Sequence, residues 1–172
     1  VQLRLKRASS REFYELGLRV HAVTRARGVP LIINDRVDIM LALGAEGVHV
    51  GRNDLPLARV RALAGKRIVG YSVNTAAHLD EAVAAGVDYV GLGPVYATAT
   101  KADTGPALGL AGVAELVATT ELPCVAIGGI TATNLAQVLT TGVAGCCVVS
   151  AILGQPDIAR ATLELREIIR QC

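Results

Sequence analysis

Seven short apolar runs constrain the fold of this chain more than any other feature of its sequence. Each run is followed by turn or polar residues and then by apolar residues at helical spacing, a pattern typical of parallel βαβ units. The expected strands are residues 1–5, 29–33, 47–50, 67–71, 89–92, 123–127 and 146–149. Between the first two, Ser9 and Glu12 have the spacing of a helix capping box, and Gly28 suits the end of that helix. A last amphipathic helix is expected over about 156–170.

The composition agrees with a packed α/β domain. Of 172 residues, 52% are hydrophobic and 19% are charged, so the chain can bury a core as one domain over 1–172. The net charge of +2 is too small and too scattered for a nucleic-acid partner. No apolar run reaches the roughly 18 residues of a membrane helix, so we expect a cytoplasmic protein with no membrane partner. The four cysteines have no CxxC spacing, which argues against a disulfide or cysteine-metal framework.

Strands that alternate with single helices fit either an open doubly wound sheet or a closed TIM (β/α)8 barrel. Seven βα units do not close a barrel. One further unit upstream of Val1 would give eight, at a length near the lower, roughly 200-residue end of barrel sizes. We therefore expect an α/β TIM barrel whose first βα unit is absent from this sequence.

Polar residues at the carboxyl ends of the strands are the candidates for a binding site in either architecture. The first strand places Gln2, Arg4 and Lys6 on one face, which suits a diphosphate; a solvated edge strand is the alternative interpretation. Asp35 and Asp54 follow the next two strands, and two carboxylates can share a Mg²⁺ ion with substrate phosphate and water. Each aspartate also precedes a helix, so a pair of N-caps is the competing interpretation.

The C-terminal half offers a second group of candidates. The connection over 95–109 is too long for a plain βα loop, and Thr98, Thr100 and Lys101 on it are donors to phosphate oxygen; a mobile polar loop is the alternative. The Gly128–Gly129 pair follows the penultimate strand and Ser150 follows the last, where barrels often bind phosphate. Glycine pairs also serve ordinary turns, so this signal is weak when taken alone.

The remaining polar candidates are weaker. His49 lies within a strand, which favours a buried or supporting histidine over a catalytic base. His21 and His78 are expected on helix surfaces. Ser72 ends the fourth strand and could donate a hydrogen bond to a ligand, while Thr75 is a candidate helix cap. No Ser/His/Asp or Cys/His set emerges.

Seven short motifs extend through nearly the whole chain. They are Gln2-Leu3-Arg4-x-Lys6, Ile33-Asn34-Asp35, Gly47-Val48-His49-Val50-Gly51-x-x-Asp54, Gly91-Leu92-Gly93-Pro94, Thr98-x-Thr100-Lys101, Ala126-Ile127-Gly128-Gly129-Ile130 and Val149-Ser150-Ala151-Ile152. In this order and spacing they closely resemble the thiamine phosphate synthase family, which is a TIM barrel. Leu5 and Arg7 stand where that family usually has Glu and Asp.

The resemblance implies a transferase that joins 4-amino-2-methyl-5-(diphosphooxymethyl)pyrimidine to hydroxyethylthiazole phosphate and releases diphosphate. The residues that it implies for the pyrimidine diphosphate are Gln2, Arg4, Lys6, Asn34, Ser72 and Lys101. Those for the thiazole phosphate are Thr98, Thr100, Gly129, Val149 and Ser150. It also implies Mg²⁺ on Asp35 and Asp54, and a homodimer as a common assembly.

The same resemblance implies a dissociative reaction in which no general base is obligatory. Arg4, Lys6 and Lys101 would be the catalytic residues, because their charges offset that of the departing diphosphate. Two alternatives remain: a related thiazole tautomerase, with His49 as its local candidate base, and a non-catalytic barrel that binds phosphate ligands.

Overall fold

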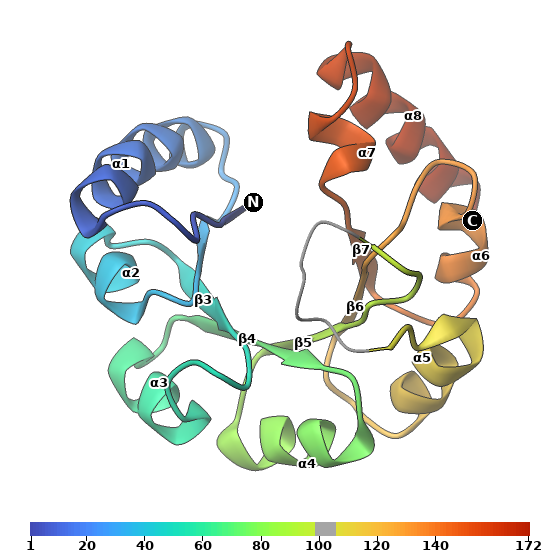
Figure 1. The fold of residues 1–172 in the computed structure, drawn as a ribbon, viewed down its shortest axis with the longest axis horizontal. Helices are drawn as coiled ribbons and strands as arrows, with labels where there is room; N and C mark the ends of the chain where they lie inside the picture. The colour runs from blue at the N-terminus through green and yellow to red at the C-terminus, as the bar shows by residue number, and fades with distance from the viewer. Residues whose placement is uncertain (99–105) are drawn as a thin grey trace. The chain divides into compact units, whose positions relative to one another are not determined.

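A computed structural model of the chain describes residues 1–98 and 106–172. These form two compact units, one of Val1–Ser72 with Glu81–Asp88 and one of Val73–Asp80 with Tyr89–Cys172. Strands and helices alternate along the chain through most of both units (Figure 1). No helix among the described residues is long and apolar enough to span a membrane. One domain over 1–172 and a cytoplasmic location stay predictions.

Parallel strands build the first unit. Its elements are β1 (Gln2–Leu3), α1 (Ser10–Ala26), β2 (Ile32–Asn34), α2 (Val37–Leu43), β3 (Gly47–Val50), α3 (Leu57–Ala64) and β4 (Ile68–Val73), whose last residue enters the second unit. Each strand pairs in parallel with the next, in chain order. All residues of β2 and β3 are buried, as expected for parallel strands covered on both faces.

Helix α1 begins at the predicted capping box. The Ser9 hydroxyl accepts a hydrogen bond from the Glu12 N–H (3.3 Å), and Glu12 Oε2 accepts one from the Ser9 N–H (2.8 Å). The surface position expected for His21 is wrong. His21 is buried, and its Nε2 lies 3.0 Å from Glu46 Oε1, because it shares the inward face of the helix with Phe13.

The second unit continues the same alternation. Its elements are α4 (Ala76–Ala85, shared with the first unit), β5 (Tyr89–Leu92), α5 (Gly109–Ala118), β6 (Cys124–Ile127), α6 (Leu135–Leu139), β7 (Gly145–Cys147), α7 (Ser150–Leu153) and α8 (Ile158–Gln171). Strands β5, β6 and β7 pair in parallel, and α6 packs against α8. The last predicted strand ends two residues early, because Val149 is already the N-cap of α7.

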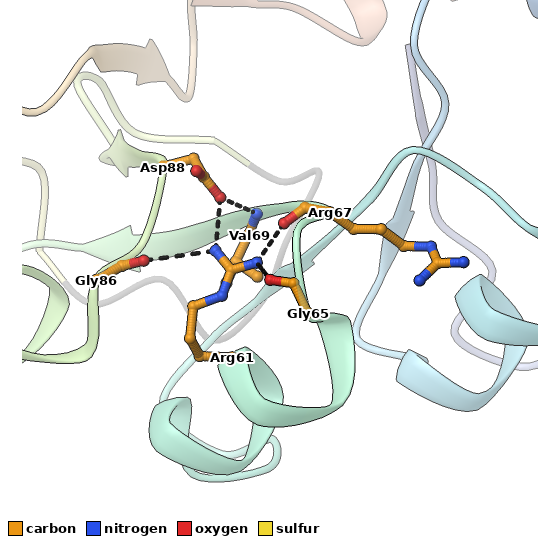
Figure 2. Close-up of polar contacts among 6 residues, drawn as sticks. All are labelled: Arg61, Gly65, Arg67, Val69, Gly86 and Asp88. Carbon is orange, nitrogen blue, oxygen red and sulfur yellow. Dashed lines mark hydrogen bonds and ion pairs between the residues drawn. The ribbon is translucent and has the colours of Figure 1, made fainter.

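One arginine of the first unit joins α3 to the segments on either side of it. Arg61 Nη2 donates to the carbonyl oxygens of Gly65 (2.5 Å) and Arg67, and Nη1 donates to the carbonyl of Gly86 and forms an ion pair with Asp88 Oδ2 (2.8 Å). Figure 2 shows the guanidinium at the centre of these acceptors, with the Arg67 side chain pointing away. The side chain of Arg61 is 23% exposed, so water screens this cluster only in part.

Asp88 completes the cluster at the amino end of β4. The oxygen that pairs with Arg61 also accepts a hydrogen bond from the Val69 N–H (2.7 Å). One carboxylate therefore links a helix, a strand and the joint that precedes β5.

We expect Arg61→Leu to lower the free energy of unfolding by about 2 kcal/mol, because several carbonyl groups and Asp88 lose their donor. In a chain of this size that corresponds to a fall in Tm of roughly 4–8 °C. Thermal unfolding followed by circular dichroism measures it. The matched control is Arg59→Leu, an exposed arginine on the same helix, which should shift Tm by less than about 2 °C. Equal shifts for the two variants would contradict the role of the cluster.

Candidate active site

A lysine and two aspartates converge in the first unit, just beyond the carboxyl ends of its strands. Lys6 Nζ forms an ion pair with Asp35 Oδ2. The Asp35 carboxyl in turn lies within hydrogen-bonding reach of the Asp54 carboxyl. Burial raises the pKa of Asp54, and the Asp35 carboxyl raises it further, against the opposing effects of the Gly51 N–H and of Lys6. The structure thus brings together the two aspartates that lie apart in the sequence.

Neither aspartate caps a helix. The N-cap residue of α2 is Arg36 and that of α3 is Pro56, and neither makes a side-chain capping bond. Asp54 Oδ2 instead accepts a hydrogen bond from the Gly51 N–H (2.8 Å), which closes the turn after β3. The competing N-cap interpretation is therefore wrong for both aspartates.

The backbone of Asp35 adopts an unusual conformation. Its φ of 62° is the only positive φ of a non-glycine residue among the described parts of the chain. Such a conformation costs on the order of 1 kcal/mol, and Asp tolerates it better than most residues. The Asp35 N–H still donates to the His49 carbonyl (2.8 Å), so the strand pairing survives while the chain turns. Residues held in this region cluster at functional sites.

Ser72 and His49 lie close to the same turn. His49 is buried, and its Nε2 lies 2.9 Å from Ser72 Oγ. A Cβ added to Gly51 would lie 3.6 Å from Asp54 Oδ2 and 4.0 Å from Ser72 Oγ, so all three groups surround one position. The burial of His49 agrees with the prediction of a buried histidine that supports neighbouring residues. Its hydrogen bond to Ser72 is a contact that the sequence did not indicate.

The other candidates of the first unit differ in exposure. Gln2 and Arg4 are exposed and make no side-chain hydrogen bond to the described residues, whereas Asn34 is buried. The intervening Leu3 and Leu5 are half-buried, as the predicted alternation of faces requires. Strand β1 ends at Leu3, so Arg4 and Lys6 follow the strand rather than lie within it.

A cleft of about 700 Å³ opens beside the two aspartates. Much of its wall is apolar, including Leu41, Leu55 and Leu63. Its arginine, Arg36, is paired with Asp38, which raises the pKa of Arg36 above its usual value. Among the described residues, the only cationic side chain that lines this cleft is thus already paired, so they offer no unpaired positive charge there to a diphosphate.

The Gly128–Gly129 pair lies in the second unit, against the segment after β5. The Val95 and Tyr96 N–H groups donate to the Ile127 and Gly128 carbonyl oxygens (2.9 and 3.0 Å). A Cβ on Gly129 would lie 2.7 Å from Tyr96 Cβ, and φ at this residue is 67°. Only glycine satisfies both conditions without strain.

The remaining candidates of this unit lie on loops and at a helix start. Val149 and Ser150 are exposed at the beginning of α7, and Thr98 is half-buried. Thr100 and Lys101 lie outside the described residues.

A family model described as thiamine monophosphate synthase matches residues 1–152. The chain belongs to the thiamine monophosphate synthase family. It is 49% identical over 171 residues to a protein named thiamine-phosphate synthase of Desulfitobacterium hafniense strain Y51, which covers 99% of this chain and 83% of that protein. The corresponding protein of Syntrophomonas wolfei is 48% identical over 169 residues, covering 98% and 81%.

A comparison with solved structures also finds a protein of this family. Thiamine phosphate pyrophosphorylase from Pyrococcus furiosus superimposes with a TM-score of 0.92 at 39% identity, covering 99% of this chain and 82% of that one. The predicted TIM-barrel fold and the predicted transferase class are thereby confirmed.

We expect Asp54→Asn to raise Tm at pH 7 by a few °C in the absence of divalent ions. The raised pKa of Asp54 means that its ionised form destabilises the folded chain, so the gain should vanish as the pH falls below the carboxyl range. Asp38→Asn is the matched control with the opposite sign. Arg36 lowers the pKa of Asp38, so its loss should lower Tm at pH 7. Thermal unfolding at pH 7 and at about pH 2.5, below the ordinary Asp pKa of about 3.9, tests both, and a lower Tm for Asp54→Asn at pH 7 would contradict the destabilisation of ionised Asp54 by burial and by Asp35.

Proposed function

We propose that this chain is a thiamine phosphate synthase that condenses the pyrimidine diphosphate and the thiazole phosphate to thiamine phosphate and diphosphate. The observation that carries the proposal is the convergence of Lys6, Asp35 and Asp54 in a chain nearly half identical to proteins of that name. Such a reaction needs positive charge next to a polyanion; Lys6 carries one such charge, and Asp35 and Asp54 can hold a divalent cation that supplies more.

The proposed cofactor is Mg²⁺, held by Asp35 and Asp54. Their mutual repulsion is relieved by a divalent cation, and carboxylate oxygens are the ligands that Mg²⁺ prefers. No group of three or more His, Cys, Asp or Glu residues in the described chain could hold a metal, but Mg²⁺ commonly takes one or two carboxylates and completes its shell with water and phosphate. When bound, the ion supplies positive charge that stabilises the diphosphate as a leaving group.

The protein's own cations contribute to the same neutralisation. Arg4, Lys6 and Lys101 are the proposed catalytic residues, and Gln2, Asn34 and Ser72 complete the set that binds the pyrimidine diphosphate. The electron-rich aminopyrimidine stabilises the cation that forms as diphosphate departs, and the thiazole nitrogen captures it. Because no proton has to be removed, no general base is required.

Alignment of the second substrate depends on its phosphate. Thr98, Thr100, Gly129, Val149 and Ser150 are the proposed phosphate-binding residues for the thiazole. The backbone N–H groups near Gly129 and at Val149 and the hydroxyl groups of Thr98, Thr100 and Ser150 are donors to phosphate oxygens. Holding this phosphate places the thiazole nitrogen for attack. We further expect small-molecule partners only, a cytoplasmic location and a homodimer.

Incubation with both substrates and Mg²⁺ tests the proposal. A synthase releases diphosphate and thiamine phosphate in equal amounts, and chelation of Mg²⁺ abolishes both. A thiazole tautomerase would change the thiazole without releasing diphosphate, and a non-catalytic barrel would bind phosphate ligands without turnover. Either of these outcomes would overturn the proposal.

Lys101→Ala should lower kcat about 100-fold and change the KM for the thiazole phosphate by less than threefold. The reason is that the positive charge of the lysine stabilises the negative charge of the departing diphosphate. Loss of one such group typically lowers kcat by about 10²- to 10³-fold. Steady-state kinetics with each substrate varied in turn measures the effect, and the exposed Lys66→Ala serves as the control. A change confined to the KM for the thiazole phosphate would contradict this role.

A further inference from the structure

The Asn134 side chain is bound at both ends to the loop that follows β6. Asn134 Nδ2 donates to the Gly129 carbonyl oxygen (3.0 Å), and Oδ1 accepts from the Thr131 N–H (2.8 Å). Asn134 is the N-cap residue of α6, yet its side chain makes no capping bond to that helix. The bond to Thr131 lies within the turn that leads into α6, because the Thr131 carbonyl also accepts from the Leu135 N–H (3.0 Å), whereas the bond to Gly129 ties the side chain to the preceding loop.

The carbonyl oxygens of three successive residues in this loop each accept a hydrogen bond. Backbone N–H groups of the segment after β5 hold those of Ile127 and Gly128, as described above, and Asn134 holds that of Gly129. In a trans peptide the carbonyl and the following N–H point in opposite directions. The bonds to Gly128 and Gly129 therefore also orient the N–H groups of Gly129 and Ile130.

These two N–H groups have no acceptor within the described part of the chain. Successive backbone N–H groups around a residue with positive φ form a concavity that binds anions. Gly129 has such a φ, 67°, and the preceding Gly128 has a φ of 105°.

We propose that Asn134 is a positioning residue that holds the Gly129–Ile130 peptide so that the Ile130 N–H, beside the Gly129 N–H that the Tyr96 bond orients, donates to the phosphate of the thiazole substrate. This inference rests on the proposed function, which assigns Gly129 to that phosphate. It adds Asn134, which acts through the backbone and does not itself touch the ligand, and the Ile130 N–H, which does.

The test compares hydroxyethylthiazole phosphate with unphosphorylated hydroxyethylthiazole. Asn134→Ala should raise the KM for the phosphorylated thiazole about 5- to 10-fold, the range expected for one hydrogen bond. The KM for the pyrimidine diphosphate should stay within twofold, and kcat within threefold. The KM for the unphosphorylated thiazole should not change, because that molecule does not use the oriented N–H groups.

Two further variants separate positioning from a general effect on the fold. Asn134→Asp keeps an acceptor for the Thr131 N–H but sets a carboxylate oxygen against the Gly129 carbonyl, so it should raise the KM for the phosphorylated thiazole at least tenfold while remaining folded. Thr133→Ala removes a neighbouring contact to the Thr131 hydroxyl (2.9 Å) and leaves Gly129 bound, so its kinetics should match those of the unmodified protein. An unchanged KM in Asn134→Ala and Asn134→Asp, or an equal change for both thiazoles, would overturn the inference.

Calorimetric titration with the two thiazoles gives the same comparison without turnover. An unmodified chain that binds the phosphorylated thiazole but releases no diphosphate would overturn the proposed function while the Asn134 variants still test the inference. Tighter binding of the phosphorylated thiazole that is lost in Asn134→Ala supports the inference in either case. An unmodified chain with no preference for the phosphorylated thiazole would overturn it.

Discussion

Two carboxylates held against each other are the constraint on which the first unit's site depends. Asp35 and Asp54 come from different strand ends, and burial together with the nearby Asp35 carboxyl raises the pKa of Asp54. The chain reaches this arrangement through a left-handed backbone at Asp35 and a turn closed by the Gly51 N–H. Lys6 offsets part of the repulsion by pairing with Asp35. The same repulsion is what a bound cation would relieve, and this supports the Mg²⁺ site that we propose.

The phosphate site that we propose in the second unit relies on a different kind of donor. Around Gly129 the relevant donors are peptide N–H groups, and their directions are set by what holds the neighbouring carbonyl oxygens. No charged side chain is needed there, because a phosphate monoester that is only held in place requires directional donors more than net charge. A departing diphosphate requires positive charge, which in our proposal comes from Lys6 and from a cation held by Asp35 and Asp54.

Stability and function use different ends of the strands in the first unit. The Arg61–Asp88 cluster lies at the amino end of β4, where one arginine satisfies the carbonyl groups of the turn after α3 (Figure 2). Lys6, Asp35 and Asp54 follow the carboxyl ends of the other strands. This division is typical of TIM barrels, in which loops at the carboxyl ends carry the chemistry. Substitutions at one end can therefore change stability without altering the groups that bind substrate.

The sequence by itself determined the element order, the strands at 47–50 and 89–92, the capping box at Ser9 and the family, because these depend on local periodicity and on motifs in a fixed order. It also placed both aspartates at strand ends, but it left them equally suited to be N-caps. Only the tertiary structure excluded the N-cap interpretation. The contact of Asp35 with Asp54 depends on neighbours distant in sequence, and the bond of Asn134 to Gly129 depends on the backbone direction of a loop; no local spacing encodes either.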